Sequence, residues 1–181
     1  MTTSLATPGT PLTTTEINTN VSRADIEAFL YFEARLLDDR DFERWIELYR
    51  EDAPFWMPAW DDDGELTRDP QKEISLIYYP DRSGIEDRVF RIRTDRSSAT
   101  SLPEPRTGHT ISNVELLEER EGEIDIRFNW ISHYFRYNTT DSYFGTSFYT
   151  LDVRGDSPLI ASKKVVLKND YIHHIVDVYM V

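Results

Sequence analysis

The side chains best suited to catalysis or metal binding in this 181-residue sequence include four histidines, His109, His133, His173 and His174. A mononuclear iron site needs two histidines and a carboxylate around one point. His173 and His174 are adjacent, and adjacent side chains in a strand point to opposite faces. His173 and Asp177 have the spacing H-x-x-x-D, but in the strand that we expect there they would lie about 13 Å apart. The pattern favours hydrogen-bonding or interface histidines over a metal site.

A carboxylate–histidine pair in an apolar pocket is a second candidate chemistry. Glu33 lies on the apolar face of an expected helix, and Asp141, Asp170 or His133, near expected strand ends, could pair with it. Burial raises the pKa of such a carboxyl group, which could then act as a general base on a carbon acid. Cap, turn or salt-bridge roles explain the same residues and are favoured.

Two further features bear on ligand binding. The acidic triplet Asp61, Asp62 and Asp63 could hold a divalent cation, although a solvated loop is the favoured interpretation. The sequence has no G-x-G-x-x-G, G-x-x-x-x-G-K-[ST] or G-x-S-x-G motif, so no motif supports nucleotide binding or a hydrolase nucleophile elbow.

Composition excludes several classes of function. The 33 acidic and 20 basic residues give a net charge of −13, which argues against nucleic-acid and anionic-membrane partners. The absence of cysteine excludes disulfides, thiolate zinc sites, a cysteine nucleophile and a cysteine-ligated iron–sulfur cluster on this chain. No apolar run is long enough to span a membrane, and a cytoplasmic location is expected.

The expected organisation is a flexible arm over residues 1–20 followed by a single domain over residues 21–181. The arm is rich in threonine. The alternative to a flexible arm is one that becomes ordered by lying across a neighbouring subunit. Ser22 and Asp25 have the spacing of a capping box, which predicts a helix through Leu37. Further helices are expected after Asp41 and over residues 83–94, and a long loop over residues 95–107.

Strands are expected in the remainder of the domain. Pro54 and Pro58 make residues 55–60 an expected edge strand. From Thr110 onward apolar residues alternate with polar ones, and strands are expected around 124–130, 143–153, 162–167 and 175–181. Helices followed by an antiparallel meander indicate an α+β fold, and a curved sheet around the helices would form a cone with a cavity.

Aromatic residues are numerous, with 4 Trp, 10 Tyr and 9 Phe. Segments such as 134–137 place aromatic side chains on both faces of expected strands. An exposed face with Tyr, Trp and Arg is typical of a permanent subunit interface. The alternative is one large core with tyrosines whose hydroxyl groups reach solvent.

Several strings of the sequence resemble the small (β) subunit of aromatic-ring-hydroxylating dioxygenases, in the branch that acts on benzoate, toluate, anthranilate and 2-halobenzoate. The resemblance runs from about residue 31 to residue 181. It rests on FEARLLDDR (32–40), FWMPAWDDD (55–63), EISLIYYP (73–80), EDRVFRI (86–92), RSSAT (96–100), VEL (114–116), RFNW (127–130) and VVLKNDYI (165–172).

The resemblance implies a cystatin-like or NTF2-like cone, related to SnoaL and scytalone dehydratase, with N-terminal helices in the concave face of a long, curved, mainly antiparallel sheet. It also implies an α3β3 hexamer whose large (α) subunit holds a Rieske [2Fe–2S] cluster and a mononuclear Fe(II), fed from NADH by a reductase. The complex would add both atoms of O₂ to a benzoate-like ring. This chain would then be structural, in contact with α and with other β subunits, and would carry no catalytic, cofactor or metal residue.

Contacts with the α subunit are expected from two loops, a strand end and an aromatic strand. The candidate contact residues are Trp56, Pro58, Trp60, Asp62, Tyr78, Tyr79, Arg82, Arg96, Arg106, Tyr134, Arg136 and Tyr137. The competing hypotheses are a stand-alone isomerase or dehydratase that uses the cavity, and a binding module without chemistry. A cavity filled by side chains such as Phe29, Trp45 and Phe128 would contradict both.

Overall fold

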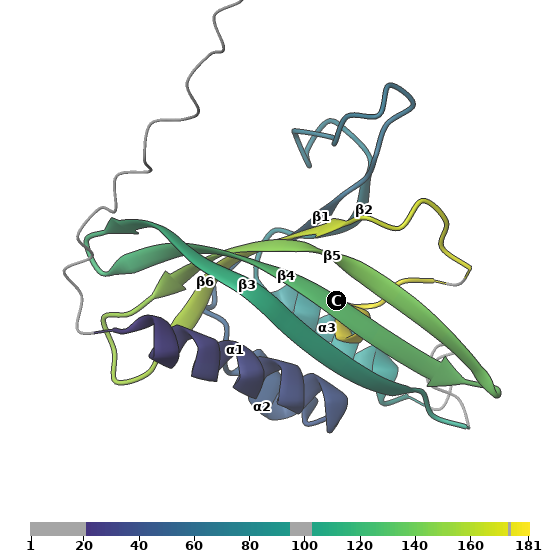
Figure 1. Cartoon of the computed structure of the whole chain (residues 1–181), viewed down its shortest axis with the longest axis horizontal. Helices are drawn as coiled ribbons and strands as arrows, with labels where there is room; N and C mark the ends of the chain where they lie inside the picture. The colour runs from purple at the N-terminus through teal and green to yellow at the C-terminus, as the bar shows by residue number, and fades with distance from the viewer. Residues whose placement is uncertain (1–20, 95–102, 174) are drawn as a thin grey trace, which may run out of the picture.

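The backbone forms one curved sheet with helices on its concave face (Figure 1). The structure is a computed structural model, and it describes residues 21–94, 103–173 and 175–181. The expected arm, residues 1–20, and most of the expected loop at 95–107 lie outside the described residues. The strands are β1 (Phe55–Pro58), β2 (Ser75–Tyr79), β3 (Arg106–Arg120), β4 (Glu123–Arg136), β5 (Thr139–Asp152) and β6 (Leu159–Leu167).

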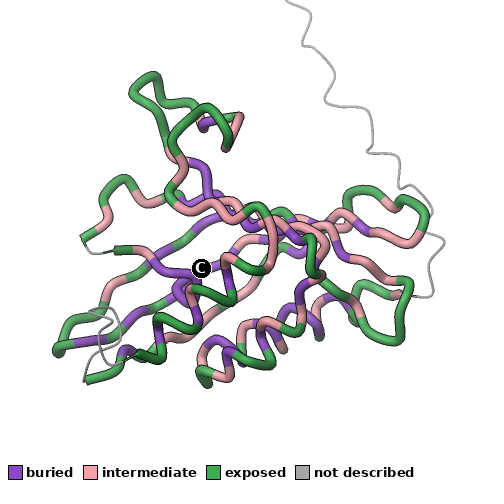
Figure 2. Tube along the Cα trace, turned by 180° about the vertical axis from the view of Figure 1, so that it is seen from behind, coloured by how far each residue is buried: buried purple, intermediate pink, exposed green. Residues whose placement is uncertain are grey.

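The six strands lie in the order β2-β1-β6-β5-β4-β3. Neighbouring strands from β3 to β6 are antiparallel, which confirms the predicted meander, whereas β1 runs parallel to β6. The segment between β1 and β2 stands away from the sheet and is mostly exposed (Figure 2). The arrangement is the α+β fold that the sequence predicts.

Three helices cover the concave face: α1 (Arg23–Asp38), α2 (Phe42–Ile46) and α3 (Arg82–Ile92). The predicted capping box begins α1, since the Ser22 side chain accepts from the Asp25 amide and the Asp25 carboxylate accepts from the Ser22 amide. Asp81 caps α3 by accepting from the Ser83 amide at 2.9 Å. No helix of the described residues is long and apolar enough to cross a membrane.

The predicted edge position of β1 is wrong, because β1 lies between β2 and β6. Pro54 precedes the strand, and Pro58 ends it at a register shift in the pairing with β2. The two proline nitrogens, which carry no hydrogen, therefore fall at the ends of a short strand, where a missing donor costs little.

The predicted closing strand at 175–181 is also wrong. This segment holds a short 3₁₀ helix, η1 (Val178–Met180), capped by the Asp177 side chain. Its four final apolar residues are buried, and the Tyr179 ring lies 6.1 Å from that of Phe42. This apolar segment therefore packs into the concave face and fills part of the cone.

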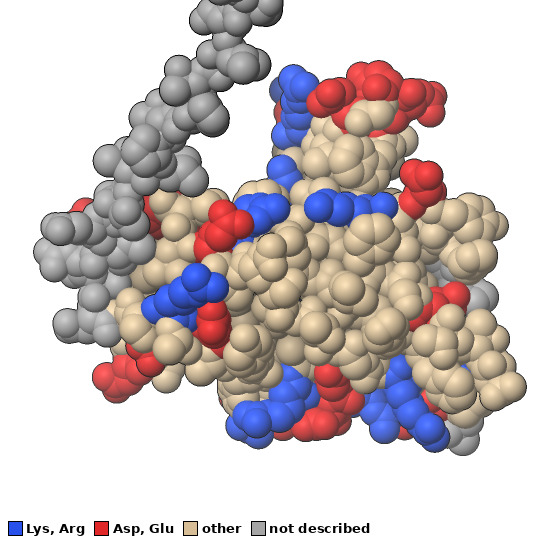
Figure 3. Space-filling model, viewed as in Figure 1, with Lys and Arg blue, Asp and Glu red and all other residues tan. Residues whose placement is uncertain are grey.

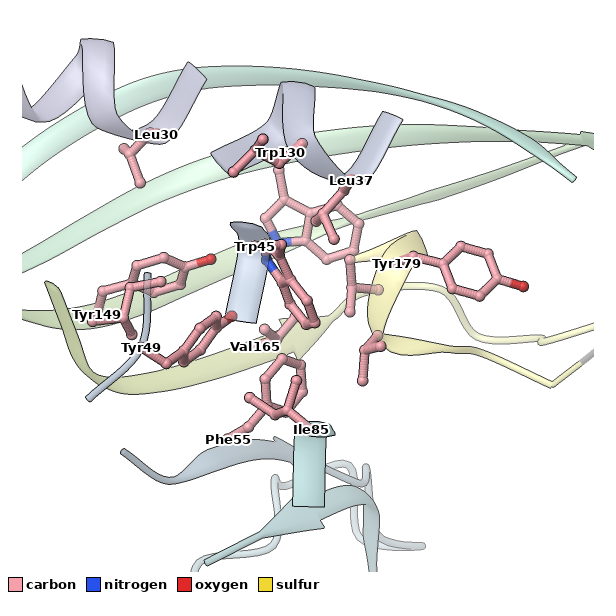
Figure 4. Close-up of a cluster of buried hydrophobic side chains, with 14 of the residues drawn as sticks. Leu30, Leu37, Trp45, Tyr49, Phe55, Ile85, Trp130, Tyr149, Val165 and Tyr179 are labelled. Atoms are coloured by element: carbon pink, nitrogen blue, oxygen red, sulfur yellow. The ribbon is translucent and has the colours of Figure 1, made fainter. Parts of the chain in front are cut away.

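The core lies between the helices and the inward side of the sheet (Figure 4). Along β4 the side chains of Ile124, Ile126, Phe128 and Trp130 are buried and alternate with more exposed residues, as predicted. Gly145 allows the close approach of β6 and Trp130, because a Cβ atom there would lie 2.2 Å from the Val166 carbonyl oxygen and 2.8 Å from the indole ring.

Candidate functional site

The interior of the cone holds the carboxylate of Glu33 on α1, a residue that is 3% exposed. Its Oε1 atom accepts from Trp45 Nε1 at 3.3 Å, from the Tyr49 hydroxyl at 3.2 Å and from Lys163 Nζ at 3.0 Å. The Tyr149 hydroxyl donates to Oε2 at 3.0 Å. Side chains from α1, the end of α2, β5 and β6 therefore meet at one carboxylate. We call these five residues the Glu33 cluster.

Aromatic rings enclose the ammonium group of Lys163 in this cluster. Its Nζ atom lies 5.3 Å from the centre of the Phe55 ring, 5.1 Å from Tyr149 and 6.0 Å from Trp45, within reach of cation–π attraction. Burial lowers the pKa of Lys163, and Glu33 opposes this shift. Burial and the charge of Glu33 raise the pKa of Tyr49 and of Tyr149 well above the ordinary value, so both remain hydrogen-bond donors.

The Glu33 cluster is built to be stable rather than to react. The carboxylate accepts from four side chains, three of them at Oε1, so its hydrogen-bonding capacity is largely used within the chain. The cavity beside it has a volume of about 20 Å³, which is room for a water molecule but not for an organic substrate. Phe29, Trp45 and Phe128 are all buried in the core. The filled interior contradicts both the stand-alone isomerase and the binding module.

The residues expected to pair with Glu33 lie elsewhere. His133 points to the opposite face of the sheet, where its Nδ1 atom lies 2.8 Å from the Ser142 hydroxyl. Asp141 faces Tyr134 across the strands, eight residues along β5 from Tyr149, or about 26 Å. Asp170 is exposed after β6. Sequence reasoning identified the buried carboxylate, but the partners were wrong.

Sequence reasoning missed a histidine–carboxylate contact that the described residues contain. His109 on β3 has its Nδ1 atom 2.6 Å from Asp38 Oδ1 at the end of α1, and its backbone amide donates to Asp38 Oδ2 at 3.0 Å. A surface groove of about 330 Å³ lies beside this pair and includes Tyr31 and Arg35. Burial favours the neutral carboxyl group, but the hydrogen bonds and charge of His109 and the bond from Thr107 outweigh it and lower the pKa of Asp38.

Asp38→Asn is expected to lower the free energy of unfolding by about 1–3 kcal/mol at neutral pH, because it removes a charged acceptor that three donors share. The pKa of Asp38 is lower in the folded state, so its contribution is present above the unfolded value of about 3.9 and is lost as the pH falls through the folded value. Urea unfolding of the wild type and the variant should therefore converge toward acid pH. Asp39→Asn, at the exposed neighbouring position, is the control and should change little; an equal effect of both variants would contradict the role of the pair.

The candidate metal ligands do not converge. Among the described residues no group of three or more His, Asp or Glu side chains could hold an ion. His173 is exposed and its ring lies edge-on to Tyr171 at 4.7 Å, while His174 lies outside the described residues. Asp177 forms a two-point ion pair with Arg88 of α3.

The acidic triplet forms a surface turn. The Asp62 amide donates to the Asp61 carboxylate at 2.8 Å, and the Asp63 carboxylate accepts from the Glu65 amide at 2.9 Å. All three acidic residues are exposed. These contacts are those of a solvated loop, as the favoured interpretation predicts.

The side of the sheet that faces away from the helices carries large apolar side chains. Its centre is uncharged and its charged groups lie mostly along the borders (Figure 3). The cross-strand neighbours Ile131 and Phe144 are 47% and 45% exposed, and Phe135 and Phe148 are 38% and 36% exposed. Trp56 on β1 continues this surface beneath the Lys164 side chain, whose Nζ atom lies 4.5 Å from the ring centre. We call these five apolar residues the outer face.

The predicted contact residues divide between this surface and the core. Trp56 and Tyr78 point outward. Trp60 is 48% exposed, and its indole N–H donates to the Leu167 carbonyl. Asp62 and Tyr137 are exposed. Arg106 is exposed and lies 5.9 Å from the Phe135 ring. The residues that are buried or bonded within the chain are Pro58, Tyr79, Arg82, Tyr134 and Arg136. Arg96 lies outside the described residues.

Tyr134 and Arg136 lie on the inward side of β4. Even-numbered residues of β4 point inward from Ile124 onward, and the alternation continues without a break to Arg136. The residues available to a partner on this strand are Ile131, His133 and Phe135. Ile131, Phe144 and Phe148 are not among the predicted contact residues, although the alternation along β4 and β5 places all three outward.

Comparison with known proteins identifies close relatives. A sequence model of the "Ring hydroxylating beta subunit" family matches residues 32–174. The chain is 58% identical over 161 residues to the toluate 1,2-dioxygenase subunit beta of Pseudomonas putida, covering 89% of this chain and 99% of the relative. It is 58% identical over 160 residues to the 2-halobenzoate 1,2-dioxygenase small subunit of Burkholderia cepacia, covering 88% and 96%.

Solved structures share the fold. The beta subunit of the benzoate 1,2-dioxygenase from Burkholderia mallei aligns with a TM-score of 0.77 and 51% identity over 90% of this chain and 99% of that chain. A putative scytalone dehydratase from Novosphingobium aromaticivorans aligns with a TM-score of 0.59 at 14% identity, covering 85% and 90%. The second likeness concerns the fold alone and supports the cone-shaped architecture.

Proposed function

The chain belongs to the ring-hydroxylating β subunit family, and from this premise we propose that it is the structural β subunit of a dioxygenase acting on a benzoate-like substrate. The relatives at 51–58% identity are named for toluate, 2-halobenzoate and benzoate, which share a ring-borne carboxylate. The observation that carries the structural role is the combination of a filled interior with an exposed apolar outer face.

The redox chemistry of such an oxygenase would belong to a partner. A Rieske [2Fe–2S] cluster is held by two cysteines and two histidines, and this chain has no cysteine. Its described residues also offer no ligand group for a mononuclear iron. We therefore assign both iron sites to an α subunit, with electrons delivered from NADH by a reductase. The proposal includes a cytoplasmic location, because NADH is produced and reoxidised there.

The proposed assembly is an α3β3 hexamer in which the outer face is covered by a neighbouring subunit. Exposed apolar side chains in this number on one face are a mark of an interaction surface. Trp56, Trp60 and Tyr78 each combine aromatic area with one polar group, and Arg106 lies beside the Phe135 ring; Trp, Tyr and Arg are the residues enriched in interface hot spots. The acidic turn at Asp62 and the Arg106 and Tyr137 end of the sheet would lie at the rim.

The test is size-exclusion chromatography with light scattering, on this chain alone and co-expressed with the large subunit encoded beside it, followed by an iron assay. We expect a complex several times the 21.2 kDa of this chain, with iron present only when the partner is present. An iron-free oligomer that ignores the partner would overturn the proposal.

A further inference from the structure

Two buried side-chain nitrogen atoms of the described residues, His109 Nε2 and Trp130 Nε1, have no hydrogen-bond partner within the protein. Among the described residues the buried side-chain atoms without a hydrogen bond are His109 Nε2, Trp130 Nε1, Ser132 Oγ and Tyr143 OH. The His109 side chain is 5% exposed and the Trp130 residue is 3% exposed. A buried donor or acceptor without a partner is costly, so the position of each such atom calls for an explanation.

His109 and Trp130 both line the small cavity beside the Glu33 cluster, together with Ser147. The Nδ1 atom of His109 is engaged by Asp38 on the groove side. His109 lines both the groove and the cavity, and its Nε2 atom is shielded from solvent, so we place this atom toward the enclosed cavity. Figure 4 shows the Trp130 indole projecting from its strand into the same cluster as Trp45.

We propose that this cavity is a specific site for one ordered water molecule that bridges Trp130 Nε1 and His109 Nε2. A volume of about 20 Å³ exceeds the minimum for one water, and the lining supplies polar groups, which a buried water needs. The indole N–H can only donate, so the water accepts from it. Its other partner is His109 Nε2, to which the water donates when the imidazole is neutral and from which it accepts when the imidazole is protonated.

The bridge has a consequence for the histidine. With Nδ1 held by the Asp38 carboxylate and Nε2 by the water, both ring nitrogens of His109 have a hydrogen-bond partner. The Asp38–His109 contact lies at the C-terminal end of α1. The water would connect this contact to the cavity that Glu33 and Lys163 also line. Polar contacts would then extend from the groove into the core without an unpartnered atom at His109 or Trp130.

The experiment is a crystal structure of the protein, alone or with its partner subunit, at a resolution that defines ordered water. We expect one density peak within hydrogen-bonding distance of both Trp130 Nε1 and His109 Nε2. A second structure, of Trp130→Phe, removes the donor and keeps an aromatic ring, and its peak should vanish or lose most of its occupancy.

Tyr143→Phe is the matched control. Tyr143 is on β5 and its hydroxyl is also buried without a partner, but it does not line the cavity. Its removal should leave the peak unchanged. An empty cavity in the wild type, or a peak that persists at full occupancy in Trp130→Phe, would overturn the proposal, and the wild-type density decides the question even if the Trp130 variant does not fold.

Discussion

Replacing Lys163 by methionine is expected to lower the free energy of unfolding by about 3–5 kcal/mol, the usual cost of removing one partner from a buried ion pair. Methionine preserves much of the side-chain volume, so the loss comes from charge rather than from a cavity. The variant leaves the Glu33 carboxylate 3% exposed with only neutral donors, Trp45, Tyr49 and Tyr149. Urea unfolding of the isolated chain at neutral pH measures the change.

Lys164→Met provides the matched control for this experiment. Lys164 is the next residue along β6 and points to the other face of the sheet, over the Trp56 ring. The same chemical change there is expected to cost less than about 1 kcal/mol. The double variant Glu33→Gln/Lys163→Met should recover most of the lost stability, because it removes the uncompensated charge. Equal destabilisation by Lys163→Met and Lys164→Met would show that the pair contributes nothing specific.

The Glu33 cluster also shows how far the sequence alone can predict this site. An acidic residue within an apolar helical stripe identifies Glu33 as buried, and the structure confirms it. Its partner is 130 residues away on β6, where Lys163 and Lys164 are consecutive. Which of the two lysines points inward depends on the register between β5 and β6, and nothing local to the two residues sets that register.

The two wrong strand assignments have the same origin. Residues 55–58 have proline at both ends, and local propensity places such a segment at an edge. Pairing with β2 and β6 places it inside the sheet, and this pairing depends on contacts distant in sequence. The final residues, 178–181, are apolar enough for a strand but fill the concave face instead. The capping box of α1 and the alternation along β4 were predictable because each is encoded within a few residues.

The filled interior and the outer face have related causes. A cone whose cavity is occupied by the Glu33 cluster and by η1 has no room there for a substrate, so its remaining recognition surface is outside. The 4 Trp, 10 Tyr and 9 Phe of the chain exceed what the inward side accommodates, and Ile131, Phe135, Phe144 and Phe148 remain exposed on the sheet. The number of aromatic residues therefore predicted that some would lie exposed on the sheet, and the alternation along β4 and β5 decides which of them do.

Ile131→Glu and, separately, Phe148→Glu are expected to weaken assembly with the large subunit by at least about 100-fold, the equivalent of losing one interface hot spot. Both side chains are exposed in the isolated chain, so a carboxylate there remains solvated and the fold should persist. In the complex the same carboxylate would be buried against apolar groups without a partner, which costs several times more than the lost contact. Light scattering of the co-expressed subunits measures the loss of the large complex.

Phe90→Glu separates an interface effect from a general effect of added charge. Phe90 is 71% exposed on α3, on the helix side of the molecule rather than on the outer face. The variant carries the same charge change and should assemble as the wild type does. Circular dichroism of the three isolated variants should match the wild type. If the outer-face variants fold and still form the full complex, the outer face is not the surface that the partner covers; if all three lose assembly equally, charge rather than position is responsible.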